Sequence, residues 1–388
     1  MPRRSPTVVI APDSFKGSLS AAAAAAAIAE GLRRVWPDAA LRQCPMADGG
    51  EGTLDAILAH GGRRLAQCVS GASGRPLDAA YGMIDDSAVA VLEAAQIVGL
   101  TDPAIAAIDV GQRSTRGLGE LIRHCLDAGV RRFMIGLGGS STNDGGAGLL
   151  AALGMKLADA GGTTIGATPE GLASLAAVDA SGLDPRLGEA RITVMSDVDN
   201  PLTGERGATA IFGPQKGVSP ERIAEYDRRI AHFAALAERA LGSSARGKPG
   251  AGAAGGLGFA LLAIGAEVRS GAEVVATVIG LDKALAGADW AITGEGKSDA
   301  QTALGKTPFF VARRATKLGV PATLISGGID RAALPELGRH FAGCFSLPSG
   351  PASLEQCLAD AAGLLADRAQ QLARLFESVP MHFRPTGR

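Results

Sequence analysis

Two loops near the start of the chain carry acidic and basic side chains where a ligand could bind. The first contains Asp13, Lys16 and Ser18, and the second contains Asp48 and Glu51. Each follows a short segment typical of a β-strand and precedes a helix pattern. The carboxyl ends of parallel strands face the ligand crevice of an α/β sheet, so these charges could bind an anionic substrate and a metal ion. The alternative is local, because Asp48 and Glu51 also favour a helix N-terminus through its dipole.

A glycine-rich segment has the composition of an anion-binding loop. Residues 136–146 read Gly-Leu-Gly-Gly-Ser-Ser-Thr-Asn-Asp-Gly-Gly and lie between a predicted strand and a predicted helix. Backbone N–H groups at such a junction bind phosphate, and hydroxyl side chains add donors. An ordinary tight turn is the alternative, but five glycines and three hydroxyls favour phosphate binding. The residues expected to bind phosphate are Gly138, Gly139, Ser140, Ser141 and Thr142.

Two carboxylates follow a further predicted strand at 192–195. Asp197 and Asp199 are two residues apart and could hold Mg²⁺, which favours carboxylate and water oxygens. One of them could instead be a general base, and an Asx-type turn before Pro201 is the structural alternative. The turn at residues 212–217 adds another cation, Lys216.

The last polar segment follows a predicted strand at 290–293. It contains Glu295, Asp299, Gln301 and Lys306. Residues 300–307 miss the Walker A pattern because Ala300 replaces its first glycine, and six residues separate them from the strand. The segment is therefore not a P-loop, and we interpret it as a polar site at a strand end.

The sequence gives no support for the motifs of several other enzyme classes. Residues 250–255 match the dinucleotide pattern GxGxxG, but no strand precedes them and no suitable acid follows. A nicotinamide-dependent dehydrogenase is therefore disfavoured. The five histidines share no motif, and the sequence has no HExxH, GxSxG or zinc-ligand spacing, so zinc-dependent or serine hydrolysis is unsupported.

Composition narrows the class of protein. The 388 residues carry 38 basic and 39 acidic side chains, and the net charge of −1 gives no electrostatic basis for binding nucleic acid or membranes. Five scattered cysteines are typical of reduced cytosolic proteins. The alanine-rich run at 21–29 is far shorter than the ~20 residues of a membrane span. We therefore expect a soluble, cytoplasmic protein with a small-molecule substrate. Its oligomeric state is left open, with a homodimer as one candidate.

The elements that position these residues alternate between strand and helix. We expect strands at 7–11, 41–46, 88–92, 133–137, 192–195, 290–293, 322–326 and 341–345, and helices at 20–34, 51–60, 117–128, 146–153, 220–241, 308–318 and 354–375. Alternating units at both ends imply a parallel sheet covered on both faces. We predict an α/β fold in which residues 1–75 and 285–388 form a Rossmann-like domain. Residues 76–284 form an inserted α/β domain, and the active site is expected in the cleft between the two.

Several of these segments resemble the bacterial type 1 glycerate kinase family. They begin with residues 8–18, Val-Val-Ile-Ala-Pro-Asp-Ser-Phe-Lys-Gly-Ser, and residues 46–53, Met-Ala-Asp-Gly-Gly-Glu-Gly-Thr. The resemblance continues through 111–115, 138–148, 197–204, 212–217, 249–258 and 292–306, and extends to about residue 328. It implies ATP-dependent phosphorylation of D-glycerate and a Rossmann-like domain with a second domain inserted. Ser298 and Arg116 depart from the family pattern, which favours an aliphatic residue at the first position and an uncharged or aromatic one at the second.

The resemblance also implies roles for the candidate residues. Phosphoryl transfer requires positioning, charge stabilisation and a base for the hydroxyl proton. We expect Asp48 to be that base, with Asp197 as the alternative, and Lys16 to assist catalysis. Metal binding is expected at Asp197, Asp199 and Glu295, and phosphate binding also at Lys306. Asp299 and Gln301 complete the polar site. The residues expected to contact D-glycerate are Asp13, Lys16, Ser18, Glu51 and Arg113.

The resemblance favours 2-phosphoglycerate over 3-phosphoglycerate. One alternative is another small-molecule kinase, either of the GHMP type, whose phosphate loop resembles Gly-Leu-Gly-Gly-Ser-Ser, or acting on a different hydroxy acid. Another is a non-catalytic sensor of a phosphorylated or carboxylated metabolite, which would bind its ligand without Mg²⁺.

Overall fold

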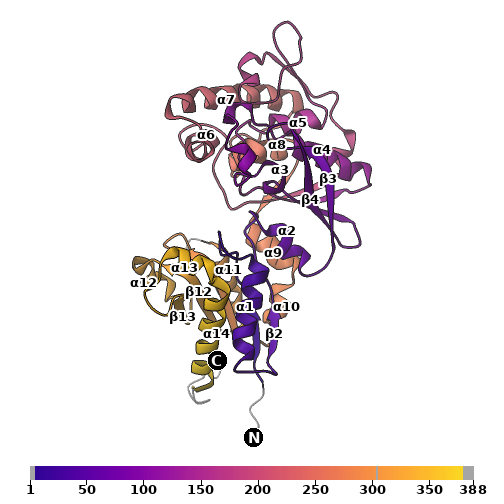
Figure 1. Cartoon of the computed structure of the whole chain (residues 1–388). Coiled ribbons are helices and arrows are strands. Elements are labelled where there is room, and N and C mark those ends of the chain that lie inside the picture. Colours follow the sequence, from indigo (N-terminus) through magenta and orange to yellow (C-terminus); the bar gives the residue numbers. More distant parts are fainter. Residues whose placement is uncertain (1–4, 303–304, 379–388) are drawn as a thin grey trace. The chain divides into compact units, whose positions relative to one another are not determined.

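The computed structural model describes residues 5–302 and 305–378, and the chain divides into two compact units. Unit 1 contains residues 1–48, 55–60 and 272–388, and unit 2 contains residues 49–54 and 61–271 (Figure 1). The chain passes from unit 1 to unit 2 and back within a short segment that includes helix α2 (Thr53–Leu58). Each unit has its own sheet and its own hydrophobic core.

Unit 1 is built on a five-stranded parallel sheet in the order β13-β12-β11-β1-β2. Strand β2 lies on one side of β1, and the later strands β11, β12 and β13 lie on the other side. The order of the strands along the sheet therefore reverses between β1 and β11. Doubly wound sheets bind ligands outside the carboxyl ends of the strands at such a switch point. The strands are β1 (Thr7–Ile10), β2 (Ala40–Gln43), β11 (Trp290–Ser298), β12 (Ala322–Ile329) and β13 (Gly343–Ser346).

Helices α1 and α14 pack closely against one another in unit 1, because both contact faces are made of small residues. A Cβ atom added at Gly31 of α1 would lie 1.9 Å from the carbonyl oxygen of Ala366 in α14. Trp36, Trp290 and Phe376 close one end of this core, with Trp290 and Phe376 stacked at a centroid distance of 5.1 Å. The helices are α1 (Ala21–Arg33), α9 (Gly271–Val278), α10 (Leu281–Leu285), α11 (Thr307–Lys317), α12 (Leu334–Leu337), α13 (Leu354–Ala359) and α14 (Ala361–Ser378).

Unit 2 is built on a six-stranded mixed sheet in the order β10-β9-β6-β5-β4-β3. Strands β10, β9, β6 and β5 are parallel, whereas β4 is antiparallel to both β5 and β3. These strands are β3 (Arg63–Ser70), β4 (Pro76–Ile84), β5 (Val89–Glu93), β6 (Arg132–Gly136), β9 (Arg191–Met195) and β10 (Glu267–Arg269). A separate antiparallel pair is formed by β7 (Lys156–Ala158) and β8 (Ala177–Asp179).

The helices of unit 2 supply most of the apolar side chains that cover its sheet. Helix α4 buries Leu118, Leu121, Ile122 and Leu126, and α7 ends at Gly242 in the left-handed conformation. Both ends of α7 agree with the prediction from sequence. The helices are α3 (Ala95–Val98), α4 (Arg116–Asp127), α5 (Ala147–Ala152), α6 (Ala208–Phe212), α7 (Pro220–Leu241) and α8 (Leu257–Ala263). No helix in the described part of the chain is long and apolar enough to cross a membrane.

The predicted fold class is confirmed, and some elements differ from expectation. The antiparallel hairpin of β3 and β4 was not predicted, and it joins residues 63–75 to the sheet of unit 2 rather than to the first domain. Residues 272–284 belong to unit 1, where Asp282 accepts a hydrogen bond from Arg314 at 2.7 Å. Both divisions therefore fall before residues 75 and 285. The single helix predicted over 354–375 is wrong, because the backbone leaves the helical region at Asp360 and separates α13 from α14.

Candidate functional site

In unit 1, the switch point of the sheet brings together the loops that follow β1 and β2. The backbone N–H of Asp13 donates to the carbonyl of Gly294 in β11 at 2.8 Å, which anchors the first loop to the neighbouring strand. The N–H of Met46 donates to the carbonyl of Pro12 at 2.8 Å, so the second loop runs beside the first. These contacts place the carboxylates of Asp13 and Asp48 near enough to interact electrostatically.

Asp13 has an unusual environment for a carboxylate. Burial is the largest cause that raises its pKa, to about 7, and the negative charge of Asp48 raises it further. The Ser14 N–H donates to Asp13 Oδ1 at 2.6 Å and acts in the opposite direction, as do the Thr307 hydroxyl and the charge of Lys16. A carboxyl group with a pKa near neutrality can exchange a proton under physiological conditions.

The N-terminus of α11 lies beside Asp13 and presents an unsatisfied hydroxyl group. Thr307 is 1% exposed, and its Oγ1 atom makes no hydrogen bond of normal geometry. It is nevertheless close enough to the Asp13 carboxylate to lower the pKa of that group. Lys306, the N-cap residue, provides no side-chain cap. This end of α11 therefore presents a poorly satisfied hydroxyl group and the positive end of a helix dipole.

The expected polar site of Glu295, Asp299, Gln301 and Lys306 forms an ordered network in unit 1. Glu295 is 9% exposed, and its Oε1 atom accepts hydrogen bonds from Ser298 at 2.8 Å and Thr302 at 2.7 Å. Burial raises the pKa of Glu295. Lys306 Nζ lies 3.3 Å from Asp299 Oδ1, which also accepts from the Gln301 backbone N–H at 2.9 Å. Strand β11 extends to Ser298, further than predicted, and so carries Glu295 within the sheet.

Three more residues that were predicted to contact the substrate lie in different environments. Lys16 is exposed in the loop after β1. The hydroxyl of Ser18 donates to the carbonyl of Phe15 at 2.9 Å and stabilises that loop locally. Glu51 is exposed and belongs to unit 2, where the buried Glu93 at the end of β5 accepts from the N–H groups of Gly52 at 3.1 Å and Leu54 at 3.0 Å.

In unit 2, the glycine-rich segment follows β6 and leads into α5, as predicted. Its three hydroxyls are buried and differ in their partners. Ser141 donates to the carbonyl of Val98 at 2.9 Å, Ser140 accepts from Lys216, and Thr142 Oγ1 has no hydrogen-bond partner. Gly139 has a φ of +77°, which favours glycine. A Cβ atom added at Gly138 would lie 2.4 Å from the Cα atom of Gly50, so the second loop motif packs directly against this segment.

Lys216 is a buried cation held against the glycine-rich segment. It is 4% exposed, and its Nζ donates to Ser140 Oγ at 2.9 Å and to the Thr142 carbonyl at 2.8 Å. Burial lowers its pKa to about 7, aided by the positive charge of Arg113 and opposed by Asp144. An anion placed beside this ammonium group would favour its charged form.

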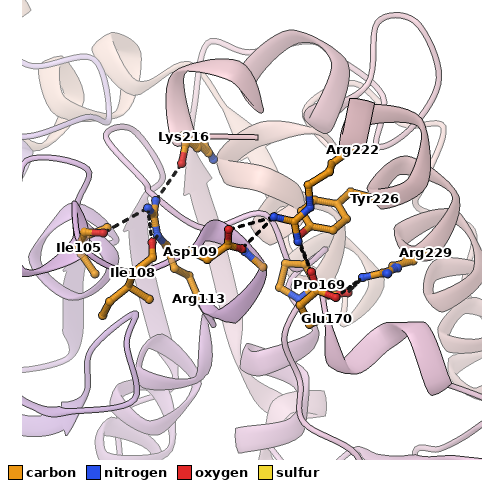
Figure 2. A network of polar contacts seen from close by, with 11 residues as sticks. Ile105, Ile108, Asp109, Arg113, Pro169, Glu170, Lys216, Arg222, Tyr226 and Arg229 are labelled. Atoms are coloured by element: carbon orange, nitrogen blue, oxygen red, sulfur yellow. Dashed lines mark hydrogen bonds and ion pairs between the residues drawn. The ribbon is translucent and has the colours of Figure 1, made fainter. Parts of the chain in front are cut away.

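Arg113 holds the loops around Lys216 in place (Figure 2). It is 6% exposed, and its guanidinium donates five hydrogen bonds to backbone carbonyls: two to Ile108 and one each to Ile105, Ser141 and Lys216. A guanidinium has five N–H donors in all. Because every donor is used within the protein, this geometry favours a positioning role over the expected direct contact with substrate.

Asp144 links backbone groups of the glycine-rich segment to those of a neighbouring helix start. It is fully buried and accepts hydrogen bonds from the Thr115 N–H and hydroxyl, both at 2.8 Å, and from the N–H groups of Gly146 at 3.0 Å and Gly148 at 3.1 Å. Burial raises its pKa, and all four hydrogen bonds oppose that effect. The carboxylate thus joins the start of α4 to the start of α5.

A cavity of about 160 Å³ lies next to this cation-bearing loop within unit 2. Gly138, Gly139, Ser140 and Lys216 form its polar side. The remaining lining is mostly apolar, and it comprises Leu100, Leu137, Ser196, Val198, Phe212, Gln215, Ala253 and Ala254. An anion-binding loop beside an apolar cavity suits a ligand with phosphates at one end and a flat ring at the other.

The predicted metal ligands do not all lie in one unit. Asp197 and Asp199 follow β9 in unit 2 and are exposed, whereas Glu295 belongs to unit 1. Asp199 makes only a long ion pair with Arg206, at 3.7 Å, and Ser196 and Val198 of the same turn line the cavity. No group of three or more His, Cys, Asp or Glu side chains in the described ranges is arranged to hold a metal ion. One or two carboxylates with substrate phosphates nevertheless suit Mg²⁺, so Asp197 and Asp199 fit that ion.

Sequence reasoning recognised the loops but missed several buried groups. Lys216 was noted only as a cation on a turn, and Asp144, Glu93 and Thr307 received no role. Asp144 was detectable in principle, because it lies inside the glycine-rich segment. The position of Thr307 at the first turn of α11 had no distinguishing signal in the sequence.

Comparison with known proteins agrees with this geometry. The profile of the glycerate kinase family matches residues 8–377. The chain is 45% identical to a glycerate kinase of Bacillus subtilis strain 168, over 94% of this chain and 96% of the relative. It is also 45% identical to a glycerate 2-kinase of Escherichia coli K12, over 83% and 85% of the two chains. The crystal structure of a candidate glycerate kinase 2 from Salmonella typhimurium LT2 matches with a TM-score of 0.85 and 43% identity, covering 97% of this chain and 99% of that one. The chain is therefore an enzyme of the glycerate kinase family.

Proposed function

We propose that the protein transfers the γ-phosphoryl group of ATP to D-glycerate, with Mg²⁺ as the metal ion and 2-phosphoglycerate as the product. The observation that carries the proposal is the buried ammonium group of Lys216, bound to the glycine-rich segment at the edge of an apolar cavity. A nucleoside triphosphate has the matching distribution of charge and apolar surface.

The nucleotide is assigned to unit 2. Its phosphates would lie over the backbone of Gly138–Ser140 beside Lys216, and its base would occupy the apolar part of the cavity. The charge on Lys216 becomes more favourable as phosphate approaches, because an anion offsets the cost of burying an ammonium group. Arg113 and Asp144 maintain the loop geometry without contacting the nucleotide.

Asp197 and Asp199 would hold Mg²⁺ at the carboxyl end of β9. When bound, this ion neutralises charge on the phosphates. Unit 1 is assigned to D-glycerate, whose carboxylate and hydroxyl groups suit the cation Lys16, the donor Thr307 and the carboxylate Asp13. The position of the phosphorylated oxygen is proposed from the E. coli relative, which is named a glycerate 2-kinase.

The test is ATP consumption by the purified chain with D-glycerate and Mg²⁺, with enolase added as the sole coupling enzyme. Enolase dehydrates 2-phosphoglycerate to phosphoenolpyruvate, so a direct rise in the ultraviolet absorbance of phosphoenolpyruvate is the expected result. ATP consumption without that signal would move the transfer to the 3-hydroxyl group. No ATP consumption by folded protein would overturn the proposal, and glycerate binding in the absence of Mg²⁺ would then favour the sensor.

A control variant separates nucleotide binding from folding. Lys248→Met removes a lysine from an exposed position of the same unit and should leave the KM for ATP unchanged. Lys216→Met should raise that KM while the KM for D-glycerate changes little, since glycerate is assigned to unit 1.

A further inference from the structure

Asp13 is only partly buried, and it differs from the buried carboxylates Asp144 and Glu295 in how few hydrogen bonds it accepts. Asp144 accepts four hydrogen bonds and Glu295 accepts two, whereas Asp13 accepts one of normal geometry, from the adjacent Ser14 N–H. A carboxylate that is partly withdrawn from water and has few donors is costly to keep ionised. It therefore retains capacity to bind a proton or a hydroxyl group.

The groups that face Asp13 come from three elements. Asp48 projects from the loop after β2, Lys16 from Asp13's own loop, and Thr307 from the first turn of α11, while β11 contributes the backbone of Gly294. Asp48 repels the negative charge of Asp13, and Lys16 and Thr307 favour it. The negative charge of Asp48 therefore disfavours ionisation of Asp13.

The hydroxyl of Thr307, which makes no hydrogen bond of normal geometry, provides an independent indication of a ligand. It is buried and lies at the N-terminus of an eleven-residue helix, beside the Asp13 carboxylate. A buried hydroxyl without a well-aligned partner is destabilising, and a ligand oxygen could remove that cost. Both groups lie at the sheet's switch point, where ligands of doubly wound sheets bind.

We propose that Asp13 is the general base of the phosphoryl transfer and that Thr307 positions the acceptor oxygen beside it. The inference rests on the proposed function and replaces the sequence-based expectation that Asp48 is the base. The O–H bond of the glycerate hydroxyl breaks, and its proton goes to the Asp13 carboxylate. The oxygen's electron pair forms a bond to the γ-phosphorus, and the bond from that phosphorus to the β–γ bridging oxygen breaks to release ADP.

The role of Asp48 follows from its charge. Its negative charge keeps the pKa of Asp13 high, so the base has enough proton affinity to accept the hydroxyl proton. Lys16 has the opposite effect, because its positive charge lowers the pKa of Asp13. Asp48 is therefore a positioning and tuning residue, and its substitution should change the pH dependence without removing the base.

The experiment measures kcat/KM for D-glycerate against pH in the full-length chain with ATP and Mg²⁺. The wild type should show a limb that rises with pH to a plateau above about pH 7, because the base must be ionised. Asp13→Asn should lower kcat by ~10²–10⁴-fold and abolish the limb. Asp48→Asn should move the limb to lower pH, since a repelling charge is lost. Thr307→Val should move it to higher pH and raise KM, since a favourable hydroxyl is lost.

Two controls keep the result interpretable. Asp38→Asn makes the same substitution at an exposed position before β2 in the same unit, and its pH profile should match the wild type. If Asp48→Asn is too slow to assay, ¹³C NMR of labelled aspartate carboxyl groups replaces kinetics. A signal titrating near pH 7 should disappear in Asp13→Asn and shift to lower pH in Asp48→Asn.

The outcomes separate this inference from the proposed function. Wild-type protein that consumes no ATP with D-glycerate refutes the proposed function itself. Wild-type turnover with Asp13→Asn retaining kcat within tenfold, or with no aspartate titrating near pH 7, overturns the assignment of Asp13 alone. Loss of the rising limb in Asp48→Asn while Asp13→Asn keeps it would return the base to Asp48.

Discussion

Asp13 in unit 1 and Asp144 in unit 2 are both carboxylates whose pKa is raised chiefly by burial, yet their surroundings differ. Asp144 accepts four hydrogen bonds and has the cation Lys216 near enough to interact. Asp13 accepts one hydrogen bond of normal geometry and is repelled by Asp48. The two carboxylates therefore share the direction of their pKa shift and differ in the number of donors around them, which marks Asp144 as structural.

The polar side chains near the two carboxylates also differ in how well their hydrogen bonds are satisfied. In unit 2, Arg113 donates all five of its N–H groups to backbone carbonyls (Figure 2), and one of these carbonyls belongs to Ser141 in the glycine-rich segment. In unit 1, the buried Thr307 hydroxyl makes no hydrogen bond of normal geometry. Arg113 and Asp144 are thus satisfied within the protein, whereas Thr307 is not.

The largest expected effect is on the stability of unit 2. Asp144→Ala would leave the buried N–H groups of Thr115, Gly146 and Gly148 without an acceptor, at about 1–3 kcal/mol each. We expect the free energy of unfolding to fall by about 3 kcal/mol or more. Amide hydrogen exchange should report faster opening at the starts of α4 and α5. Native-like protection of these amides would contradict a structural role for Asp144.

A smaller effect is expected on nucleotide binding. Lys216→Met removes the ammonium group that touches the glycine-rich segment, and a charge-assisted hydrogen bond is worth ~1.5–3 kcal/mol. The KM for ATP should therefore rise by roughly 10–100-fold. In the wild type, calorimetry in buffers of different ionisation enthalpy should show proton uptake when ATP binds above pH 7, because phosphate returns the Lys216 pKa toward its ordinary value. ATP binding without proton uptake would place the phosphates elsewhere.

Removing the Asp13 carboxylate should stabilise unit 1, whereas removing the Asp144 carboxylate should destabilise unit 2. Its pKa is about 7 in the folded protein against an ordinary value of 3.8, so the folded state binds the proton more tightly. This group therefore makes the protein less stable as pH rises from about 4 to 7, and the loss is complete above 7. Asp13→Asn should raise the unfolding midpoint at pH 8 and leave it unchanged near pH 4.

The two tryptophans make that measurement specific. Trp36 and Trp290 both lie in unit 1, so their fluorescence reports the unfolding of this unit. An Asp13→Asn protein less stable than the wild type at pH 8 would show that the carboxylate supports the fold, as Asp144 does.

The smallest expected effect concerns Ser298, which departs from the family pattern. Its hydroxyl donates to Glu295 and lies 2.7 Å from Ser326 Oγ, so Ser298→Ala should lower stability by about 1 kcal/mol. Thr302 still holds Glu295 Oε1, so kcat should fall by less than tenfold. Urea unfolding measures the change in stability, and steady-state kinetics measure the change in kcat. A loss of kcat above a hundredfold would make Ser298 part of the catalytic site.

Much of the framework could be predicted because local patterns specify it. The ends of α7 follow from Pro220 at its first turn and Gly242 after its last. The N-cap of α1 follows from Ser20, whose side chain accepts from the Ala23 N–H at 3.2 Å. The β3–β4 hairpin escaped prediction because its strands are partly exposed and lack a clear two-residue period. The break at Asp360 escaped because apolar residues continue at helical spacing on both sides of it.

By itself, the sequence determined the α/β class, the family and the loops that carry chemistry, because residue types and short-range spacing are local properties. Only the tertiary structure decided which residues of each loop have their hydrogen bonds satisfied within the protein. Arg113, Asp144 and Ser18 belong to the motifs, but their hydrogen bonds are used within the protein. Asp13 gained its neighbours Asp48 and Thr307 through the parallel pairing of β1 with β2 and β11. Burial and hydrogen-bond satisfaction depend on residues far apart in the chain, and these two quantities set the pKa of each carboxylate.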